Sequence, residues 1–231
     1  MGPKPTVGVS ILNCNFVEIK TELKILIESG IDFVHLDVMD GNFVDDITFG
    51  PSFVRDLIKE FPNIIFEVHM MVKHPHKFID SMANAGVHRF IFHFEATNNC
   101  YNHYSHSVEK LIESIRSSRM EVALAINPET DVKRIFEFVP SIDCALIMTV
   151  HPGRGGQKFI PEMMSKCLEL SKRFPNLDIE VDGGVGPKNS EICGRSCVTR
   201  IVSGSALVNS ERKSSDVIQM RNCLTQPAVS N

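Results

Sequence analysis

The chain has 231 residues, of which 43% are hydrophobic and 23% are charged, and its formal net charge is −4 at pH 7. These values are ordinary for a soluble globular protein, and the acidic balance argues against nucleic acid or an acidic membrane surface as the main partner. The N-terminal segment MGPKPTVGVSIL has too short an apolar run for a signal peptide or a membrane anchor, and none of the seven cysteines forms a C-x-x-C pair. We therefore expect a cytoplasmic protein with reduced thiols.

Eight short apolar runs of the strand type recur along the chain, with helix-like segments between them. Two of these segments, residues 16–30 and 161–174, have helical spacing, with Gly30 as a stop signal and Pro161 in the first turn. Eight strand–helix units favour an α/β fold of the closed (β/α)8 type, a TIM barrel, over an open sheet. We expect residues 1–231 to form one such domain. The strand-like runs occupy residues 6–12, 32–38, 64–70, 89–94, 121–126, 144–150, 177–181 and 199–204.

The second run ends in HLDVMDG, which places a histidine and two aspartates at the end of an apolar strand. Side chains alternate along a strand, so His35 and Asp37 point to one face and can reach a single ion or substrate. Taken alone, the segment fits equally well a buried hydrogen-bonded pair followed by a turn at Asp40 and Gly41.

The other strands decide between these interpretations, because a barrel gathers the carboxyl ends of its strands around one site. Ser10 lies at the end of the first run, His69 at the end of the third, and Asp182 at the end of the seventh. Two histidines and two aspartates form a ligand set that suits Zn²⁺, Mn²⁺, Co²⁺ or Fe²⁺ better than Ca²⁺ or Mg²⁺. Glu67 and Glu180 precede His69 and Asp182 by two residues and should share their inward face, deeper in the barrel.

Glycine-rich segments follow the last three strands, at residues 151–159, 182–187 and 203–207. Any one of them alone is better explained as a tight turn. Three of them on consecutive strand ends indicate a cradle for a phosphate group, because glycine lets backbone N–H groups approach an anion.

Other histidines are better explained as parts of surface loops. His103 and His106 have H-x-x-H spacing within the polar segment 95–107, but no third ligand lies nearby in the sequence. We interpret this segment as a solvated loop after the fourth strand. His74 and His76 receive the same interpretation.

The chain resembles the ribulose-phosphate 3-epimerase family over nearly its whole length. The enzymes of this family interconvert D-ribulose 5-phosphate and D-xylulose 5-phosphate in the pentose phosphate pathway. The matching segments are VSILN (9–13), HLDVMDGNFV (35–44), TFGP (48–51), HMMV (69–72), IMTVHPGRGGQKF (147–159), DIEVDGGV (178–185) and IVSGSAL (201–207).

The resemblance implies a metal-dependent epimerase that acts on a sugar phosphate. It assigns His35, Asp37, His69 and Asp182 as ligands of one divalent ion (Zn²⁺, Fe²⁺, Mn²⁺ or Co²⁺), with Asp37 and Asp182 as the catalytic acid–base pair. It also implies a homodimer. The residues expected to line the reacting centre are Met39, Met71 and Met148, and those expected to contact substrate are Ser10, His69, Gly153, Arg154, Gly155, Gly156, Asp182, Gly183, Gly184, Gly204 and Ser205.

Three positions depart from the family pattern. The family usually has Asp at the position of Asn15, Glu or Asn at His151, and Phe at Arg154. The last two lie beside the expected phosphate site, where Arg154 could add a cation. The polar segment 95–107 also looks longer than usual for the family.

Epimerisation at C3 needs two proton-transfer groups on opposite sides of a planar intermediate. We expect Asp37 to take the C3 proton while Asp182 donates one on the other face, with the roles exchanged in the reverse direction. Two acids beside one ion titrate as a coupled pair.

Two alternatives remain open at this point: an epimerase for another ketose phosphate such as allulose 6-phosphate, and a non-catalytic barrel that binds sugar phosphates. A phosphate-barrel decarboxylase fits less well, because such enzymes carry an Asp-x-Lys pattern where this chain has Asp37 and Met39.

Overall fold

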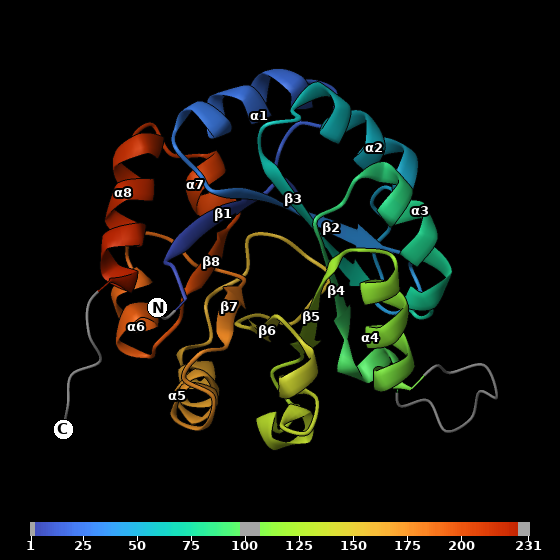
Figure 1. Cartoon of the computed structure of the whole chain (residues 1–231). Helices are drawn as coiled ribbons and strands as arrows, with labels where there is room; N and C mark the ends of the chain where they lie inside the picture. Colours follow the sequence, from blue (N-terminus) through green and yellow to red (C-terminus); the bar gives the residue numbers. More distant parts are fainter. Residues whose placement is uncertain (1–2, 98–106, 226–231) are drawn as a thin grey trace.

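A closed barrel of eight parallel strands forms the centre of the molecule (Figure 1). The computed structural model describes residues 3–97 and 107–225. Each strand pairs with its neighbours in chain order, and β1 closes the barrel by pairing with β8. The predicted TIM barrel is therefore confirmed. The strands are β1 (Thr6–Ser10), β2 (Phe33–Met39), β3 (Ile65–Met71), β4 (Arg89–His93), β5 (Glu121–Ile126), β6 (Cys144–Met148), β7 (Asp178–Asp182) and β8 (Arg200–Ser203).

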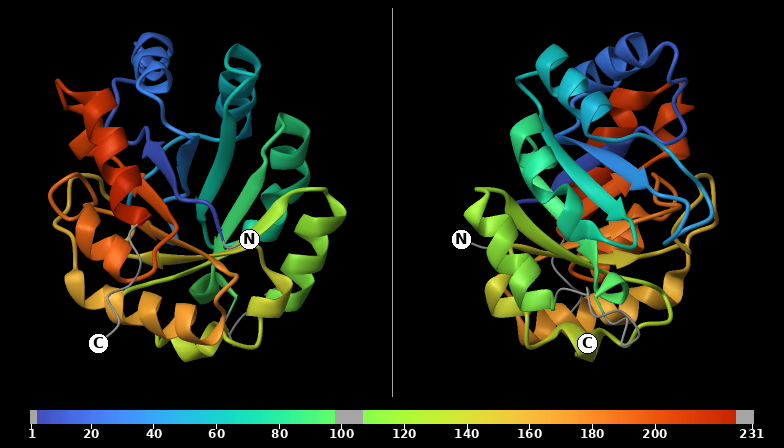
Figure 2. Two further views of the ribbon diagram at one scale, coloured as in Figure 1. Left: turned by 60° about the vertical axis from the view of Figure 1, so that its left-hand side comes forward. Right: turned by 90° about the vertical axis from the view of Figure 1, so that its right-hand side faces the viewer.

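Helices surround the strands, as the turned views in Figure 2 show. None of the helices within residues 3–97 and 107–225 is long and apolar enough to cross a membrane. The α-helices are α1 (Ile19–Glu28), α2 (Pro51–Glu60), α3 (Ile79–Ala85), α4 (Val108–Ser117), α5 (Met164–Arg173), α6 (Ser190–Arg195), α7 (Ser205–Val208) and α8 (Lys213–Leu224). Short 3₁₀ turns are η1 (Pro75–Phe78), η2 (Phe94–Ala96), η3 (Val132–Ile135), η4 (Val139–Ser141) and η5 (Pro161–Met163).

The predicted elements are found, but several end earlier or begin later than expected. β1 ends at Ser10 and β6 at Met148, although Ile11 and Val150 beyond them remain buried. Their apolar character reflects burial in the loops above the barrel, which a strand pattern cannot distinguish from pairing. Pro161 begins the turn η5 rather than α5 itself.

The barrel interior divides into an apolar half and a polar half. Outward side chains such as Leu36 and Val38 belong to the main hydrophobic core under the helices. Inward side chains of β5 and β6, with Ile91 of β4, form a second cluster of small and medium apolar residues, whereas Arg89 and His93 of β4 are polar and buried. Those of β2, β3, β7 and β8 are mostly polar and buried, namely His35, Asp37, Glu67, His69, Glu180, Asp182 and Arg200.

The floor of the barrel is closed by an aromatic ring and a buried ionic network. The Phe33 ring fills the space beside Gly8, where an added Cβ would lie 2.1 Å from a ring carbon. The Arg200 guanidinium lies 4.0 Å from the centre of that ring and binds two buried carboxylates, those of Glu67 and Glu180. The functional groups above the floor thus rest on a packed, charge-balanced layer.

Candidate active site

Strand register brings the predicted site residues to one level of the barrel. Asp37 on β2 is paired with His69 on β3, and Asp182 on β7 is paired with Met148 on β6. His35, Asp37, His69 and Asp182 each offer one ligand atom, and these four atoms lie within 4.8 Å of one another. The four side chains predicted to act together are therefore gathered at the carboxyl end of the barrel.

Each histidine presents one ring nitrogen to both aspartates. His35 Nε2 lies 3.4 Å from Asp37 Oδ1 and 3.7 Å from Asp182 Oδ2. His69 Nδ1 lies 3.0 Å from Asp37 Oδ1 and 3.6 Å from Asp182 Oδ2. Ser10 at the end of β1 donates to the other oxygen of Asp37 at 2.6 Å. The two nitrogens and two carboxylates can therefore surround one small cation.

The opposite nitrogen of His35 is held by the barrel floor. His35 Nδ1 lies 2.7 Å from Glu67 Oε1, and Glu67 in turn accepts from Arg200 at 2.8 Å. A carboxylate partner fixes the proton of His35 on Nδ1 and leaves a lone pair on Nε2. Within residues 3–97 and 107–225, no hydrogen-bond partner meets His35 Nε2, although that atom is buried. A metal ligand needs such a free lone pair, and that of His35 Nε2 faces Asp37 and Asp182, whose carboxylates could bind the same ion.

The acids outweigh burial in setting the charge of the site. Burial disfavours a charged His35, yet Asp37 and Glu67 raise the pKa of His35 well above its ordinary value. Burial also disfavours a charged His69, but hydrogen bonds with Asp182 and Asp37 raise the pKa of His69 above its ordinary value. Burial would raise the pKa of Asp37, but the two histidines hold it far below its usual range. The arrangement therefore attracts positive charge, either protons or a metal ion.

A cavity opens directly above this cluster, and every residue predicted to contact substrate lines it except the fully buried His69. Met39, Met71 and Met148, expected at the reacting centre, line it as well. The lining also includes Ser10, Asp37, Arg154 and glycines of the loops after β6, β7 and β8. The cavity thus joins an acidic, histidine-rich floor to a glycine-rich rim.

Two glycines after β7 shape the rim in a way that other residues would not allow. Gly183 has φ +113° and Gly184 has φ +68°. An added Cβ on Gly184 would lie 2.5 Å from the backbone nitrogen of Phe159, in the loop after β6. Thr149 binds the same turn, because its hydroxyl donates to the carbonyl oxygen of Gly183 at 2.6 Å. The loops after β6 and β7 are therefore packed backbone to backbone beside the cavity.

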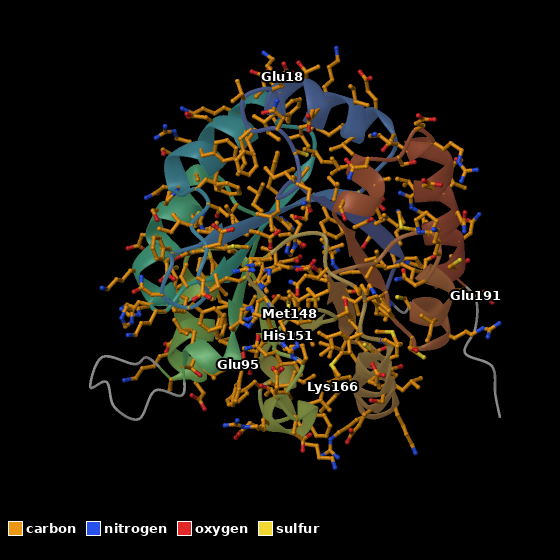
Figure 3. The ribbon with its side chains drawn as sticks, turned by 180° about the vertical axis from the view of Figure 1, so that it is seen from behind. Glu18, Glu95, Met148, His151, Lys166 and Glu191 are labelled. Atoms are coloured by element: carbon orange, nitrogen blue, oxygen red, sulfur yellow. The ribbon has the colours of Figure 1, made fainter. Side chains whose placement is uncertain are left out.

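The positions that depart from the family pattern differ in how close they lie to this cavity. Asn15 is exposed and accepts from the backbone N–H of Val17 at 3.1 Å, outside the cavity. Arg154 lines the cavity, whereas His151 pairs with Glu129 at 3.0 Å on the surface. In Figure 3, Met148 and His151 lie near the middle of the view, while Glu18 and Glu191 lie at its edge.

His103 and His106 lie outside the described residues, so the interpretation of the 95–107 loop stays a prediction. His74 and His76 lie close together at η1, with ring centres 5.9 Å apart, and belong to neither group of candidate metal ligands found among the described residues.

Two residues escaped the sequence reasoning. His93, the last residue of β4, is fully buried, and its Nε2 lies 2.8 Å from His69 Nε2. Glu95, two residues later, lies 3.2 Å from the other nitrogen of His93. The rule that identified His35 and His69, a polar residue at the end of an apolar strand, also identifies His93 once it is applied to the fourth strand.

Solved structures of other proteins share this fold at low sequence identity. KGPDC from Streptococcus mutans in complex with D-R5P has a TM-score of 0.67 and 13% identity, over 95% of this chain and 97% of that one. The 3-hexulose-6-phosphate synthase from Salmonella typhimurium has a TM-score of 0.68 and 12% identity, over 95% and 98%. At such identities the likeness supports the barrel fold alone.

Sequence comparison is more specific. The ribulose-phosphate 3-epimerase of Eremothecium gossypii is 39% identical over 88% of this chain and 86% of its own length. The enzyme of the same name from Synechocystis sp. is 34% identical over 96% and 95%. A model of the ribulose-phosphate 3 epimerase family matches residues 6–208. The chain therefore belongs to the ribulose-phosphate 3-epimerase family.

Proposed function

We propose that the chain interconverts D-ribulose 5-phosphate and D-xylulose 5-phosphate by epimerisation at C3, as an isomerase of the pentose phosphate pathway. The observation that carries the proposal is the convergence of Asp37 from β2 and Asp182 from β7 on two buried imidazoles beneath one cavity. The names of relatives from fungi, plants and bacteria support the same reaction.

His35, Asp37, His69 and Asp182 would hold one divalent ion, through His35 Nε2, His69 Nδ1 and one oxygen of each aspartate. Such an ion, when bound, would supply positive charge that stabilises the enediolate form of the sugar. Imidazole and carboxylate ligands together favour Zn²⁺, Fe²⁺, Mn²⁺ or Co²⁺.

Asp37 and Asp182 are the proposed proton-transfer groups. In the closed barrel β7 lies across from β2 and β3, so the two carboxyl groups approach the cavity floor from different sides. One takes the C3 proton and the other returns a proton to the opposite face, with roles exchanged in the reverse reaction. Ser10 donates to Asp37 at 2.6 Å and thereby fixes the orientation of that carboxylate.

The rest of the cavity would bind and shield the sugar. The backbone of Gly183, Gly184, Gly204 and Ser205, together with the 153–156 loop, is the proposed phosphate site. Met39, Met71 and Met148 would pack against the planar intermediate without offering a competing proton.

We also propose that the protein forms a homodimer and works in the cytoplasm. For the location, support comes from a relative in Oryza sativa subsp. japonica that is named a cytoplasmic isoform, 35% identical over 87% of this chain and 86% of its own length.

A spectroscopic assay of ribulose 5-phosphate conversion, before and after chelation and with single metals added back, tests the proposal. We expect turnover to disappear with the metal and to return with at least one of Zn²⁺, Fe²⁺, Mn²⁺ or Co²⁺. Allulose 6-phosphate is the comparison substrate, and kcat/KM for ribulose 5-phosphate should be the larger. Sugar-phosphate binding without turnover would point instead to a sensor.

A further inference from the structure

His93 lies inside the barrel beside the ligand set, although neither the metal site nor the acid–base pair uses it. Its ring lies nearly parallel to that of His69, with centres 4.9 Å apart and planes inclined by 24°. Phe43 from the loop after β2 also contacts the His93 ring, with ring centres 4.8 Å apart. The two neighbours fix the plane of the imidazole, so that its two nitrogens point to defined partners.

Those partners form a line from the site toward the outside of the barrel. His69 Nε2 meets His93 Nε2 at 2.8 Å, and His93 Nδ1 meets Glu95 Oε2 at 3.2 Å. His93 is fully buried, whereas the Glu95 side chain is 22% exposed. The line therefore begins at a proposed metal ligand and ends at a carboxylate near the surface.

The carboxylate at the end of the line is firmly held. Glu95 Oε1 accepts from the backbone N–H of Asn127 at 2.9 Å and from the hydroxyl of Thr130. Lys166 of α5 holds the same segment, because its ammonium donates to the carbonyl oxygens of Pro128 and Thr130, each at 2.7 Å. Figure 3 labels Glu95 and Lys166. The position of Glu95 is thus set by the connection after β5 and by α5.

The line has a direction that follows from hydrogen-bond chemistry. A carboxylate can only accept, so His93 carries its proton on Nδ1 and donates it to Glu95. His93 Nε2 is then an acceptor, and the nitrogen that faces it, His69 Nε2, must carry a proton. With that proton in place, the free lone pair of neutral His69 is on Nδ1, the atom that faces Asp37 and Asp182.

We infer that His93 and Glu95 are positioning residues that fix the tautomer of His69, so that Nδ1 is free to bind a divalent cation. The inference rests on the proposed function, since it assumes that His69 is a metal ligand. Glu67 serves His35 in the corresponding way from the barrel floor, at 2.7 Å. Each imidazole is thereby oriented by a carboxylate, directly for His35 and through a second imidazole for His69.

The substitution Glu95→Gln tests the direction of the line with almost no change in shape. The side-chain oxygen of the new amide must face the N–H of Asn127, so its NH₂ group faces His93 Nδ1. That amide donates where the carboxylate accepted, which reverses the tautomers of His93 and His69. His93→Phe is the second variant, because it keeps a packed ring but removes the acceptor. Thr97→Val is the matched control, since Thr97 is buried after η2 and donates to the carbonyl oxygen of Phe94, outside the line.

The first measurement is the affinity of the full chain for Zn²⁺, by competition with a chromophoric chelator. We expect Glu95→Gln and His93→Phe to weaken Zn²⁺ binding by about 10–100-fold, the usual effect of losing such a partner. Thr97→Val should bind Zn²⁺ within about twofold of wild type, because the Thr97 hydroxyl donates to Phe94 rather than to His93 or Glu95. The second measurement is the ¹⁵N spectrum of the imidazoles in the Zn²⁺-loaded wild type, in which His69 Nε2 and His93 Nδ1 should carry protons.

Unchanged Zn²⁺ affinity in Glu95→Gln and His93→Phe would overturn the inference, as would a His69 Nε2 without a proton in the spectrum. Should both variants fail to fold, the wild-type spectrum decides alone. Wild-type protein that binds no Zn²⁺, Fe²⁺, Mn²⁺ or Co²⁺ refutes the proposed metal site and this inference with it. A wild type that binds metal and turns over, beside variants that do both equally well, refutes the inference only.

Discussion

Arg200→Met is expected to destabilise the protein strongly, because it removes the cation at the centre of the barrel floor. Arg200 donates to Glu180 at 2.7 Å and to Glu67 at 2.8 Å, and both carboxylates are fully buried. The remaining cation, Arg89, lies farther away, at 3.6 Å from Glu67 and 3.5 Å from Glu180, and is itself bound to Glu121 at 2.6 Å. Methionine fills much of the same volume but leaves the two buried carboxylates with the more distant Arg89 and with His35, which lies 2.7 Å from Glu67.

The expected loss follows from the price of a broken buried ion pair, about 3–5 kcal/mol in the free energy of unfolding. Unfolding entropy of about 2.1 cal/mol/K per residue gives roughly 0.5 kcal/mol/K for a chain of this length, so Tm should fall by about 6–10 °C. Calorimetry of the protein stripped of divalent metal measures the shift without a contribution from metal binding.

The matched control is Arg195→Met on the surface. Arg195 pairs with Glu191 at 2.5 Å, but both side chains are more than half exposed. Such pairs contribute about 0–1 kcal/mol, so Tm should change by about 2 °C at most. Equal Tm shifts in Arg200→Met and Arg195→Met would show that the network does not support the barrel floor.

Three further predictions concern the site and its surroundings. Asp182→Asn, assayed at saturating metal, should lower epimerisation by about 10²–10⁴-fold yet retain exchange of the C3 proton with deuterated solvent; wild-type turnover would eliminate the two-carboxylate mechanism. Arg154→Ala should raise KM for ribulose 5-phosphate by up to about fivefold at low salt and by less at high salt, with little change in kcat. If KM changed neither with the substitution nor with the salt concentration, Arg154 would not belong to the phosphate site. Burial, and then the charge of Glu67, raise the pKa of Glu180 to about 7 from 4.5, so folded metal-stripped protein keeps a proton that the unfolded chain releases. Stability should therefore fall as pH rises from about 4.5 to 7. The urea unfolding midpoint of Glu180→Gln should decrease less over this pH range than that of wild type.

The fold could be predicted because its signals are local and repeated. Each strand is a short apolar run, and the alternation of strands and helices leaves few architectures for eight units. The exact strand ends could not be predicted, since Ile11 and Val150 are as apolar as paired residues but are buried by loops. Apolar residues occur both at paired strand positions and at buried loop positions, and only the strand register of the structure distinguishes the two.

The candidate ligands could be predicted from the sequence because, in a closed barrel, the position of a residue along its strand determines its height along the barrel axis. Asp182 ends β7, whereas His35, Asp37 and His69 lie within β2 and β3, and the closed sheet brings their inward side chains together. The same reasoning placed Glu67 and Glu180 deeper, and they lie on the floor as expected. It could not show that Arg200 binds both. Glu180 is the paired neighbour of Arg200 on β7, but Glu67 lies on β3, across the interior.

The division of the interior into two halves explains how one barrel can hold both a stable core and a charged site. Small apolar side chains of β5 and β6, together with Ile91 of β4, fill one part of the interior. In the other part, positively charged or proton-donating groups lie between buried acids. Arg200 lies between Glu67 and Glu180, and His35 lies between Glu67 and the two aspartates. Glu67 and Glu180 are thus balanced by Arg200. Asp37 and Asp182, beneath the cavity, can still bind one more positive charge. The divalent ion of the proposed function would supply that charge, with the lone pair of His35 Nε2 as one of its ligands.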